Sequence, residues 1–501
     1  VAGFGLALYA LDEYEANIIS RSARSFFYMA LIMADYKINF KEGSDVEALH
    51  ERSAKRLFHV ISKNKGLYVK FGQAIAVQAS IFPPPLRDTF TSLFDDAPAS
   101  SWTEVSKALE NEYGGKEAVD EIFDTIDPRP IASASIAQVH KAKLNGGQEV
   151  ALKVRHPAIK KQMQGDLIAY RIIMRAFGWA FSLPMGVISD FVAEKVLEET
   201  DFRLEAQNSS ALKSFCQNDS RFNGRIYIPE IYTQYTTAST LVMEFVQGVR
   251  MSDREAVSKA GFSHASTMRS VLQFFAAQIF SFGIVHADPH PGNFLLRYDP
   301  KSGKPQIVVL DHGLYVYERP EFRIQYTYLW KYLLSYNIDG VKQILECWGM
   351  EYNGSMGQAI IARNYDPNKK KLAKTGQDTD FESFAHQKDM SESFKNFIKS
   401  TDKLPLELVF VGRSVRILQG LNLTYGSPVN RINIFAGEAY RAIASSQQGS
   451  VLSKLSLWRM NLVFGFSLLV SDIVFYLLRL RQIITYSLFG IRSRGMEDLM
   501  D

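Results

Sequence analysis

The segment His286–Asn293, which reads HADPHPGN, constrains this chain more than any other part of its sequence. Two short apolar runs, Asn293–Arg297 and Gln306–Leu310, follow it and flank a turn-forming stretch. This pattern predicts a β-hairpin, and the second run leads directly into residues 311–313, which read DHG. Because a hairpin returns the chain to the end where it started, the residues before and after it are expected to lie together.

Asp288, Asn293 and Asp311 are the polar side chains that this hairpin would bring together. Two carboxylates and an amide supply oxygen ligands, which suit Mg²⁺ bound to a nucleotide phosphate better than they suit zinc. In kinase-type phosphoryl transfer, one Asp orients the nucleophile, a following Asn binds a metal ion, and a later Asp before x-Gly binds another. The chain reproduces this spacing, so the sequence predicts a magnesium-nucleotide site.

Three histidines near these residues leave two alternatives open. His286, His290 and His312 could form a dinuclear metallohydrolase cluster with the aspartates, or they could belong to a polar core whose hydrogen bonds are all made. The upstream sequence favours the nucleotide site over both. Val150–Val154 reads VALKV, and its central lysine, Lys153, is costly to bury in an apolar strand unless it pairs with a phosphate or a carboxylate.

Lys153 also follows, at a short distance in the sequence, a segment of small residues that precedes a predicted strand. A phosphate-covering loop is expected at this position relative to the strand lysine. The residues of the predicted loop are Ala132, Ser133, Ala134 and Ser135.

With these features in place, the stretch from about Leu67 to Tyr317 resembles the UbiB (aarF-domain) family of atypical kinases. The KxGQ signature of the family stands here as Lys70-Phe71-Gly72-Gln73, on a predicted helix where Lys70 and Gln73 share one face. The ExD element stands as Glu199-Thr200-Asp201. Each motif alone is close to a chance match, but the complete set in the order of the family is specific.

The resemblance implies roles for the residues of the N-terminal half of the site. Lys153 would contact the nucleotide phosphates and pair with Glu199. The segment Leu241–Gly248, LVMEFVQG, would be the hinge that holds adenine through backbone groups near Glu244 and Val246. The loop carries a serine, Ser133, where alanine is usual in the family, and this departure leaves the oxygen ligands intact.

The resemblance also implies that Asp288 is the catalytic aspartate, with Asn293 and Asp311 as magnesium ligands. In this family the KxGQ helix lies over the active site, and Lys70 and Gln73 reach toward the ExD element. We therefore expect Mg²⁺-dependent binding of ATP, with ATP hydrolysis or phosphoryl transfer to a small molecule rather than ordinary protein kinase activity. The residues that the resemblance marks as regulatory are Lys70, Gly72, Gln73 and Asp201. The usual DFG motif is DHG here, so His312 is expected to change how the metal loop packs.

The expected fold class is α+β, a protein-kinase-like bilobal fold with a β-rich N-lobe and a helical C-lobe. We expect a helical extension that carries KxGQ over residues 1–127 and the N-lobe with its hinge over residues 128–248. The C-lobe follows over residues 249–455, and an amphipathic, membrane-proximal helix lies in residues 456–501.

Two segments bear on contact with a membrane. Residues 1–11 read VAGFGLALYAL, about half of the roughly 20 apolar residues that a spanning helix needs. They fit the stub of a membrane anchor and equally fit an apolar helix start packed on the protein. The helix predicted over Met460–Arg481 places Asn461, Asp472 and Arg479 on one narrow face, which favours a helix docked on protein or lying on a bilayer surface over a spanning one.

The sequences DHGLY and FRIQYTYLWKYLL are similar to those of the mitochondrial subgroup of aarF-domain-containing kinases. This resemblance implies an inner-membrane protein that faces the intermembrane space and acts in lipid or coenzyme Q homeostasis, with a membrane lipid or quinone as partner. The net charge of +4 argues against a bulk electrostatic match to nucleic acid. An alternative is a catalytically idle, nucleotide-switched lipid or quinone carrier, which the apolar helices predicted at Val271–Phe282 and Met460–Leu478 would suit.

Overall fold

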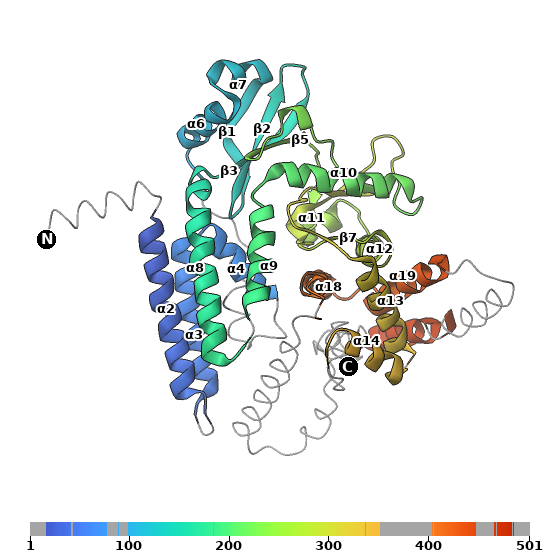
Figure 1. Ribbon diagram of the computed structural model, residues 1–501. Coiled ribbons are helices and arrows are strands. Elements are labelled where there is room, and N and C mark those ends of the chain that lie inside the picture. Colours follow the sequence, from blue (N-terminus) through green and yellow to red (C-terminus); the bar gives the residue numbers. More distant parts are fainter. Residues whose placement is uncertain are drawn as a thin grey trace.

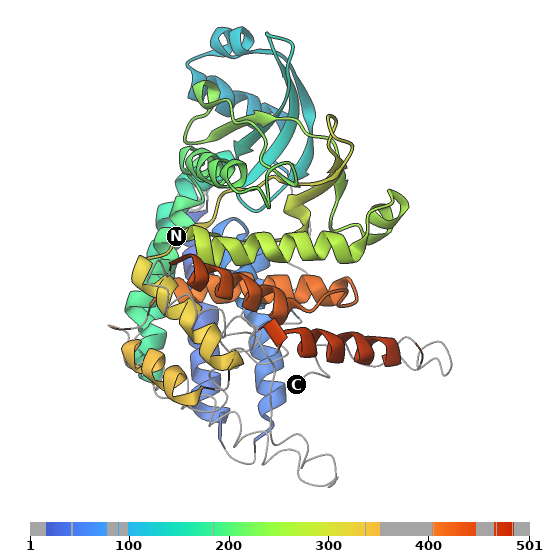
Figure 2. The same ribbon diagram turned by 90° about the vertical axis from the view of Figure 1, so that its right-hand side faces the viewer.

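A computed structural model of the chain describes two stretches. The first is residues 17–350, apart from 42–43, 78–88, 90–98, 184 and 336, and the second is residues 403–484, apart from 404, 447–464, 467 and 483. A twisted β-sheet forms one lobe, and a larger helical lobe lies beneath it (Figures 1 and 2). The predicted α+β bilobal arrangement is confirmed.

The small lobe is built on an antiparallel sheet with the strand order β1-β2-β3-β5. A hairpin joins the second and third strands, and Gly147 in its turn has a φ of 86°. Lys153 lies opposite Val139 on one side and Leu241 on the other, so the strand that carries it is internal to the sheet. The strands are β1 (Phe123–Ser133), β2 (Ala137–Leu144), β3 (Glu149–Arg155) and β5 (Thr240–Glu244).

Two helices before the sheet pack on it. They are α6 (Trp102–Tyr113) and α7 (Lys116–Ile122), and a capping box closes the start of α6, where Ser101 and Glu104 bond reciprocally. Val105, Leu109 and Val119 of these helices share a core cluster with strand residues such as Leu152. The expected border at residues 127 and 128 therefore falls within β1, and α6 and α7 pack as parts of the small lobe.

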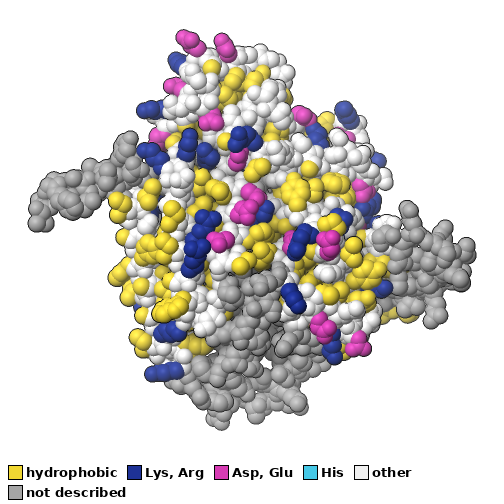
Figure 3. All heavy atoms as spheres, viewed as in Figure 1, with side chains coloured by type: hydrophobic (Ala, Val, Ile, Leu, Met, Phe, Trp, Pro, Cys, Tyr) yellow, Lys and Arg dark blue, Asp and Glu magenta, His cyan; other side chains and the backbone are white. Residues whose placement is uncertain are grey.

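Long helices flank the two lobes on one side (Figure 1). Arg21 of the first helix forms a buried ion pair with Asp166, in which Nη2 lies 2.5 Å from Oδ2 and Nε donates to Oδ1 at 3.0 Å. Hydrophobic side chains also lie exposed along this edge of the molecule (Figure 3). The helices are α2 (Ile18–Asn39), α3 (Val46–Asn64), α4 (Leu67–Val77), α8 (Pro157–Phe181) and α9 (Met185–Glu198).

The large lobe has an aromatic core, in which Trp330 stacks on Phe435 with the ring centroids 5.5 Å apart. Its helices are α11 (Arg254–Lys259), α12 (His264–Ala277), α13 (Pro320–Leu334), α14 (Ile338–Cys347), α18 (Glu407–Thr424) and α19 (Arg431–Ser446). Helix α10 (Phe202–Asn218) connects the lobes, because its first turns share a core cluster with the sheet and its later turns share one with the large lobe. A π-helical turn, Gln278–Phe282, continues α12.

Short strands position the site on top of this lobe. The predicted hairpin is present as β8 (Phe294–Tyr298) and β9 (Pro305–Val309), flanked by β6 (Val249–Arg250) and β4 (Ile226–Tyr227). Before and after it, β7 (Ile284–His286) pairs with β10 (Tyr315–Tyr317). This second pairing closes the loops around the hairpin into one compact unit.

The C-terminal helix is described at residues 468–482, and its polar side chains meet the protein. Asn430 donates to Ser471 Oγ at 3.2 Å, and Arg479 donates to the carbonyl of Pro428 at 2.6 Å. Within the described part of the chain, no helix is long and apolar enough to cross a membrane. Residues 1–11 and Asn461 lie outside the described residues.

The ion pair between Arg21 and Asp166 generates a stability prediction. Arg21→Met leaves the buried Asp166 carboxylate without its cation, so we expect the free energy of unfolding to fall by roughly 3–5 kcal/mol. Urea denaturation measures the change. The double variant Arg21→Met with Asp166→Leu should recover most of the loss, and a single variant as stable as wild type would contradict the buried pairing.

Candidate functional site

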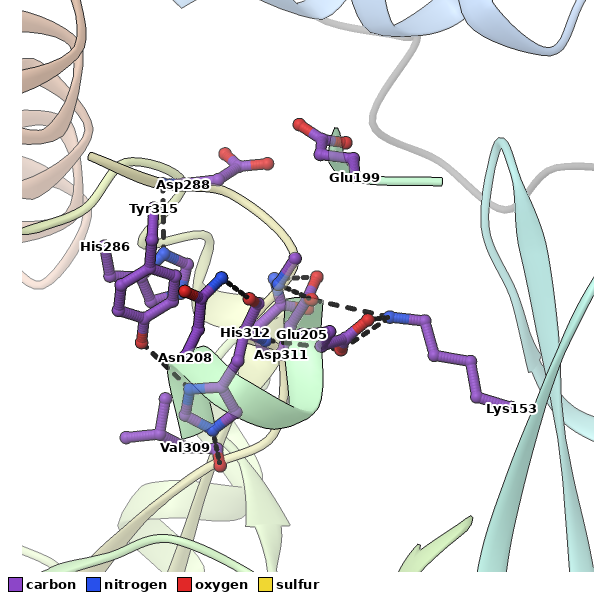
Figure 4. A network of polar contacts seen from close by, with 12 residues as sticks. Lys153, Glu199, Glu205, Asn208, His286, Asp288, Val309, Asp311, His312 and Tyr315 are labelled. Atoms are coloured by element: carbon purple, nitrogen blue, oxygen red, sulfur yellow. Dashed lines mark hydrogen bonds and ion pairs between the residues drawn. The ribbon is translucent and has the colours of Figure 1, made fainter. Parts of the chain in front are cut away.

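The hairpin brings two of the predicted metal ligands, Asn293 and Asp311, into contact. Figure 4 shows Asp311 within the polar network that Lys153 and Glu205 join. Asn293 Nδ2 donates to Asp311 Oδ2 at 3.2 Å, and the backbone N–H of Gly313 donates to Asp311 Oδ1 at 3.0 Å. Leu310 N donates to the carbonyl of Asn293 at 2.9 Å, which fixes the start of the hairpin next to its end. The sequence spacing therefore predicted this convergence correctly.

Lys153 reaches the same cluster from the sheet. Its Nζ lies 2.8 and 2.9 Å from the two carboxylate oxygens of Glu205 and 3.5 Å from Asp311 Oδ1. It also lies 5.1 Å from the ring centroid of Phe202. The lysine of the small lobe is thus joined to the aspartate of the large lobe that is predicted to be a metal ligand.

The predicted pairing of Lys153 with Glu199 is wrong. Helix α10 begins with the fully buried Phe202, and Glu205 lies on the same face one turn later, where it points at the strand lysine. Glu199 lies before this helix, in the connection from α9, and pairs elsewhere. The spacing of Phe202, Glu205 and Ala206 on one apolar face was the sequence signal that could have identified the correct glutamate.

Lys70 of α4 reaches Glu199, as the resemblance implied. Its Nζ lies 2.9 Å from Glu199 Oε2 and 3.9 Å from Asp288 Oδ2. Asp201 has a different role from the one implied for it, because its carboxylate caps α10 by accepting from the backbone N–H of Arg203 and pairs with the Arg203 side chain at 2.7 Å. Gly72 is buried in α4, and the side chain of Gln73 lies outside the described residues.

Arg413 of α18 is a site residue that the sequence reasoning missed. This buried guanidinium places Nη2 3.0 Å from Asp288 Oδ1, on the side of the carboxylate away from Lys70. The next residue, Ser414, donates to the carbonyl of His286 at 3.0 Å, so α18 is bonded to the strand that leads into Asp288. An arginine within the apolar run ELVFVGRSVRIL was the available signal, because such a charge requires an anionic partner.

The charges at the site keep its aspartates ionised. Burial opposes ionisation of Asp288, but Arg413 and Lys70 outweigh burial and lower the pKa of this carboxyl. Burial likewise opposes ionisation of Asp311, and Lys153 and Lys70 hold its pKa far below the usual range. Burial raises the pKa of Glu205 to about 7, an effect that Lys153 opposes and Asp311 reinforces.

The histidines form a core beneath the site. His312 Nδ1 lies 2.9 Å from the Tyr315 hydroxyl, and the His286 ring stacks on Tyr315 with centroids 5.0 Å apart. Burial lowers the pKa of His312 to about 3. Among the described residues there is no group of three or more His, Cys, Asp or Glu side chains placed to hold a metal ion. His312 fits the polar-core alternative, because both of its ring nitrogens have hydrogen-bond partners, whereas His286 Nε2 is buried with no hydrogen-bond partner among the described residues.

The predicted loop connects β1 to β2 beside Lys153. Ala134 N donates to the carbonyl of Ala137 at 2.8 Å, and Ser135 is buried. The hydroxyl of Ser133 is buried and has no hydrogen-bond partner among the described residues. Ala132 lies on β1 opposite Val139, the strand residue that also pairs with Lys153.

The predicted hinge follows β5. The Glu244 carboxylate accepts from the Tyr227 hydroxyl at 2.6 Å, and its backbone N–H donates to the carbonyl of Glu230 at 2.8 Å. Val246 is buried against Leu295 and Val308 of the large lobe. This apolar contact joins the predicted hinge to the hairpin of the large lobe.

Comparisons with known proteins show which family the chain is similar to. A family model described as "ABC1 atypical kinase-like domain" matches residues 92–345. "ABC1 family protein C10F6.14c" of Schizosaccharomyces pombe is 36% identical over 445 residues, which cover 87% of this chain and 82% of the relative. "AarF domain-containing protein kinase 1" of Mus musculus is 32% identical over 354 residues, which cover 68% of this chain and 66% of the relative.

A solved structure is also similar. It is "The complex structure of Rv3197-erythromycin from Mycobacterium tuberculosis", with 21% sequence identity and a TM-score of 0.41. The similarity covers 75% of this chain and 96% of that chain.

Double-mutant cycles test whether Lys153 pairs with Glu205 or with Glu199. We expect a coupling free energy of about 1–3 kcal/mol between Lys153→Met and Glu205→Gln, because the two groups form a buried ion pair. The matched cycle of Lys153→Met with Glu199→Gln should give a coupling close to zero. Denaturant unfolding of the variants measures both coupling free energies. A larger coupling of Lys153 to Glu199 than to Glu205 would contradict the pairing with Glu205.

Proposed function

The chain belongs to the ABC1 atypical kinase-like family, also called UbiB or aarF, and we propose that it binds Mg²⁺ and ATP where its two lobes meet. The proposed reaction is hydrolysis of ATP or transfer of its γ-phosphate to an acceptor other than a protein. One observation carries this proposal. Lys153 of the sheet lies 3.5 Å from Asp311, and Asp311 in turn is bonded to Asn293 across the hairpin of the large lobe.

The residues present fit a magnesium ion. Asn293 and Asp311 offer an amide oxygen and an ionised carboxylate side by side, and Mg²⁺ commonly takes one or two such ligands together with phosphate oxygens and water. When bound, the ion would neutralise charge on the phosphates. Lys153, held in place by Glu205, would contact the phosphates, and residues 132–135 would lie over them.

The position of Lys70 bears on the choice of acceptor. Its ammonium lies between Glu199 and Asp288, and Arg413 occupies the other side of Asp288. In kinases the corresponding aspartate accepts the proton of a substrate hydroxyl. With both carboxylate oxygens facing cations, water or a small acceptor fits this arrangement better than the hydroxyl of a folded protein.

We also propose a cellular setting, which rests on the resemblance to the mitochondrial subgroup. The protein would act at the mitochondrial inner membrane, facing the intermembrane space, in lipid or coenzyme Q homeostasis, with a lipid or quinone as partner. Fractionation of mitochondria with protease protection tests the location. Detection of the protein only in the matrix or the cytosol would contradict it.

A second candidate is a nucleotide-switched lipid or quinone carrier without catalytic turnover. The engagement of Asp288 by both Lys70 and Arg413 favours it, because an aspartate held by two cations is a poor proton acceptor. Asp288→Asn separates the candidates. If turnover of ATP and cellular rescue are both unchanged in this variant, the carrier is the better description.

Nucleotide binding gives the first prediction for the proposed function. Mg-ATP should raise the melting temperature of the wild type, because a ligand that binds only the folded state stabilises it. Asp311→Asn should lose most of this shift, since it removes a charged metal ligand. Thermal scans with ATP, with and without Mg²⁺, provide the measurement. A wild type that does not respond to Mg-ATP would count against the proposal.

The second prediction concerns Lys70. Lys70→Ala removes the cation that faces Asp288, so we expect steady-state phosphate release from ATP to change by about threefold or more, which corresponds to an electrostatic effect of at least about 0.7 kcal/mol. Lys55→Ala, at an exposed lysine of α3, is the matched control. Equal turnover in the wild type and both variants would show that Lys70 does not govern the site.

A further inference from the structure

Helix α2 presents its apolar side chains to the outside of the protein. Phe27 is 60% exposed and Ile38 is 64% exposed, with Leu31 exposed between them. The small residues that complete this outer face, Ala23, Ala30 and Ala34, are exposed as well. The outer face is therefore apolar from the first turns of α2 almost to its end.

Three of the four charged side chains of α2 are turned inward instead, and only Lys37 is exposed. Arg21 is paired with Asp166 of α8, and Arg24 donates to Asn64 of α3. Asp35 is bonded to two arginines of α3, with Arg52 Nη2 at 2.6 Å. Helix α2 is thus amphipathic, but its apolar face points outward and most of its charges point inward. This is the reverse of a surface helix whose outer face contacts water.

Helix α3 provides a comparison within the same hairpin of helices. Its exposed residues are almost all charged or polar: Glu47, Glu51, Lys55, His59 and Lys63. The apolar outer face of α2 is therefore a property of this helix and not of the helical extension as a whole. The outer face of α2 is suited to an apolar environment, whereas the outer face of α3 is suited to water.

The apolar surface continues onto α8, the neighbour of α2. Trp179 is 88% exposed, and Ile168 and Ile172 are exposed at helical spacing before it. Figure 3 shows hydrophobic side chains gathered along the edge that α2 and α8 form. We define the α2–α8 surface as the exposed residues Phe26, Phe27, Leu31, Ile38, Ile168, Ile172 and Trp179.

Basic side chains border the α2–α8 surface at both ends. Lys37 and Lys41 lie at the end of α2, and Lys160 is exposed at the start of α8. The only acidic residues of these two helices, Asp35 and Asp166, are bonded to arginines on the inner side. The surface is therefore apolar with a positive border, and neither helix contributes an exposed acidic side chain.

We propose that the α2–α8 surface binds the surface of a lipid bilayer that contains anionic lipids. Aromatic and aliphatic side chains along a helix that lies flat suit the boundary of headgroups and acyl chains, and lysines at its border suit anionic headgroups. A second copy of the chain is a poorer occupant, because a symmetric contact would place the positive borders of two copies near each other with no acidic residue of α2 or α8 to offset them.

This surface is separate from the nucleotide site, so vesicle binding can be measured independently of the proposed reaction. The probes are vesicles of phosphatidylcholine alone and of phosphatidylcholine with phosphatidylglycerol, sedimented with the full chain. We expect the wild type to bind the anionic vesicles. Phe27→Gln with Leu31→Gln should weaken this binding by roughly tenfold or more, since two apolar side chains are lost from the contact.

Matched variants keep the test specific. Ile324→Gln changes an exposed isoleucine of α13 outside the surface and should leave vesicle binding unchanged. Phe27→Leu with Leu31→Met keeps the surface apolar and should bind like the wild type. Lys37→Gln with Lys160→Gln should weaken binding to the anionic vesicles only. All variants should retain the thermal shift with Mg-ATP, which shows that they are folded and separates this proposal from the nucleotide site.

Three results would overturn the proposal. One is a wild type that does not sediment with anionic vesicles. Another is a Phe27→Gln and Leu31→Gln variant that binds them as the wild type does. The third is a wild type that is dimeric in solution and becomes monomeric in that double variant without binding vesicles, which would make a second copy the occupant of the surface.

Discussion

Two buried lysines that need carboxylate partners organise this molecule. Lys153 forms ion pairs with Glu205 and Asp311, while Lys70 forms one with Glu199 and lies near Asp288. Arg413 adds a third cation at Asp288. In a buried setting each charge depends on its neighbours, because an unpaired charge costs several kcal/mol. Four carboxyl groups face three cations here, and the pKa of Glu205 is raised mainly by burial, with a further contribution from the neighbouring Asp311. A magnesium ion would add the positive charge that the site favours.

The helical extension links this charge network to the outer surface. Two residues before Lys70, the Tyr68 hydroxyl accepts from Ser25 Oγ of α2 at 2.8 Å. One residue after Lys70, Phe71 stacks on Tyr170 of α8 with ring centroids 4.3 Å apart. The helices that carry the apolar α2–α8 surface are therefore the same helices that hold Lys70 against Glu199. Side-chain packing therefore connects the proposed bilayer-binding surface to Lys70 over a short distance.

The sequence could predict those parts of the site whose geometry is local. The hairpin brings Asn293 to Asp311 because its two strands are short and adjacent, and an internal strand places Lys153 with apolar neighbours. Glu205 was missed because the choice between two nearby glutamates depends on where α10 begins. Arg413 was missed because its contact with Asp288 joins segments far apart in the chain. The outward apolar face of α2 could not be predicted, because its charged residues pair with residues of α3 and α8 that are distant in the sequence.

A structure determined with Mg²⁺ and a non-hydrolysable ATP analogue tests the central claim most directly. We expect the phosphates to contact Lys153, the metal ion to bind Asn293 and Asp311, and the base to contact backbone groups of the hinge near Glu244 and Val246. A nucleotide bound away from these residues would contradict the claim. So would a protein that takes up no nucleotide while Lys153 remains on Asp311.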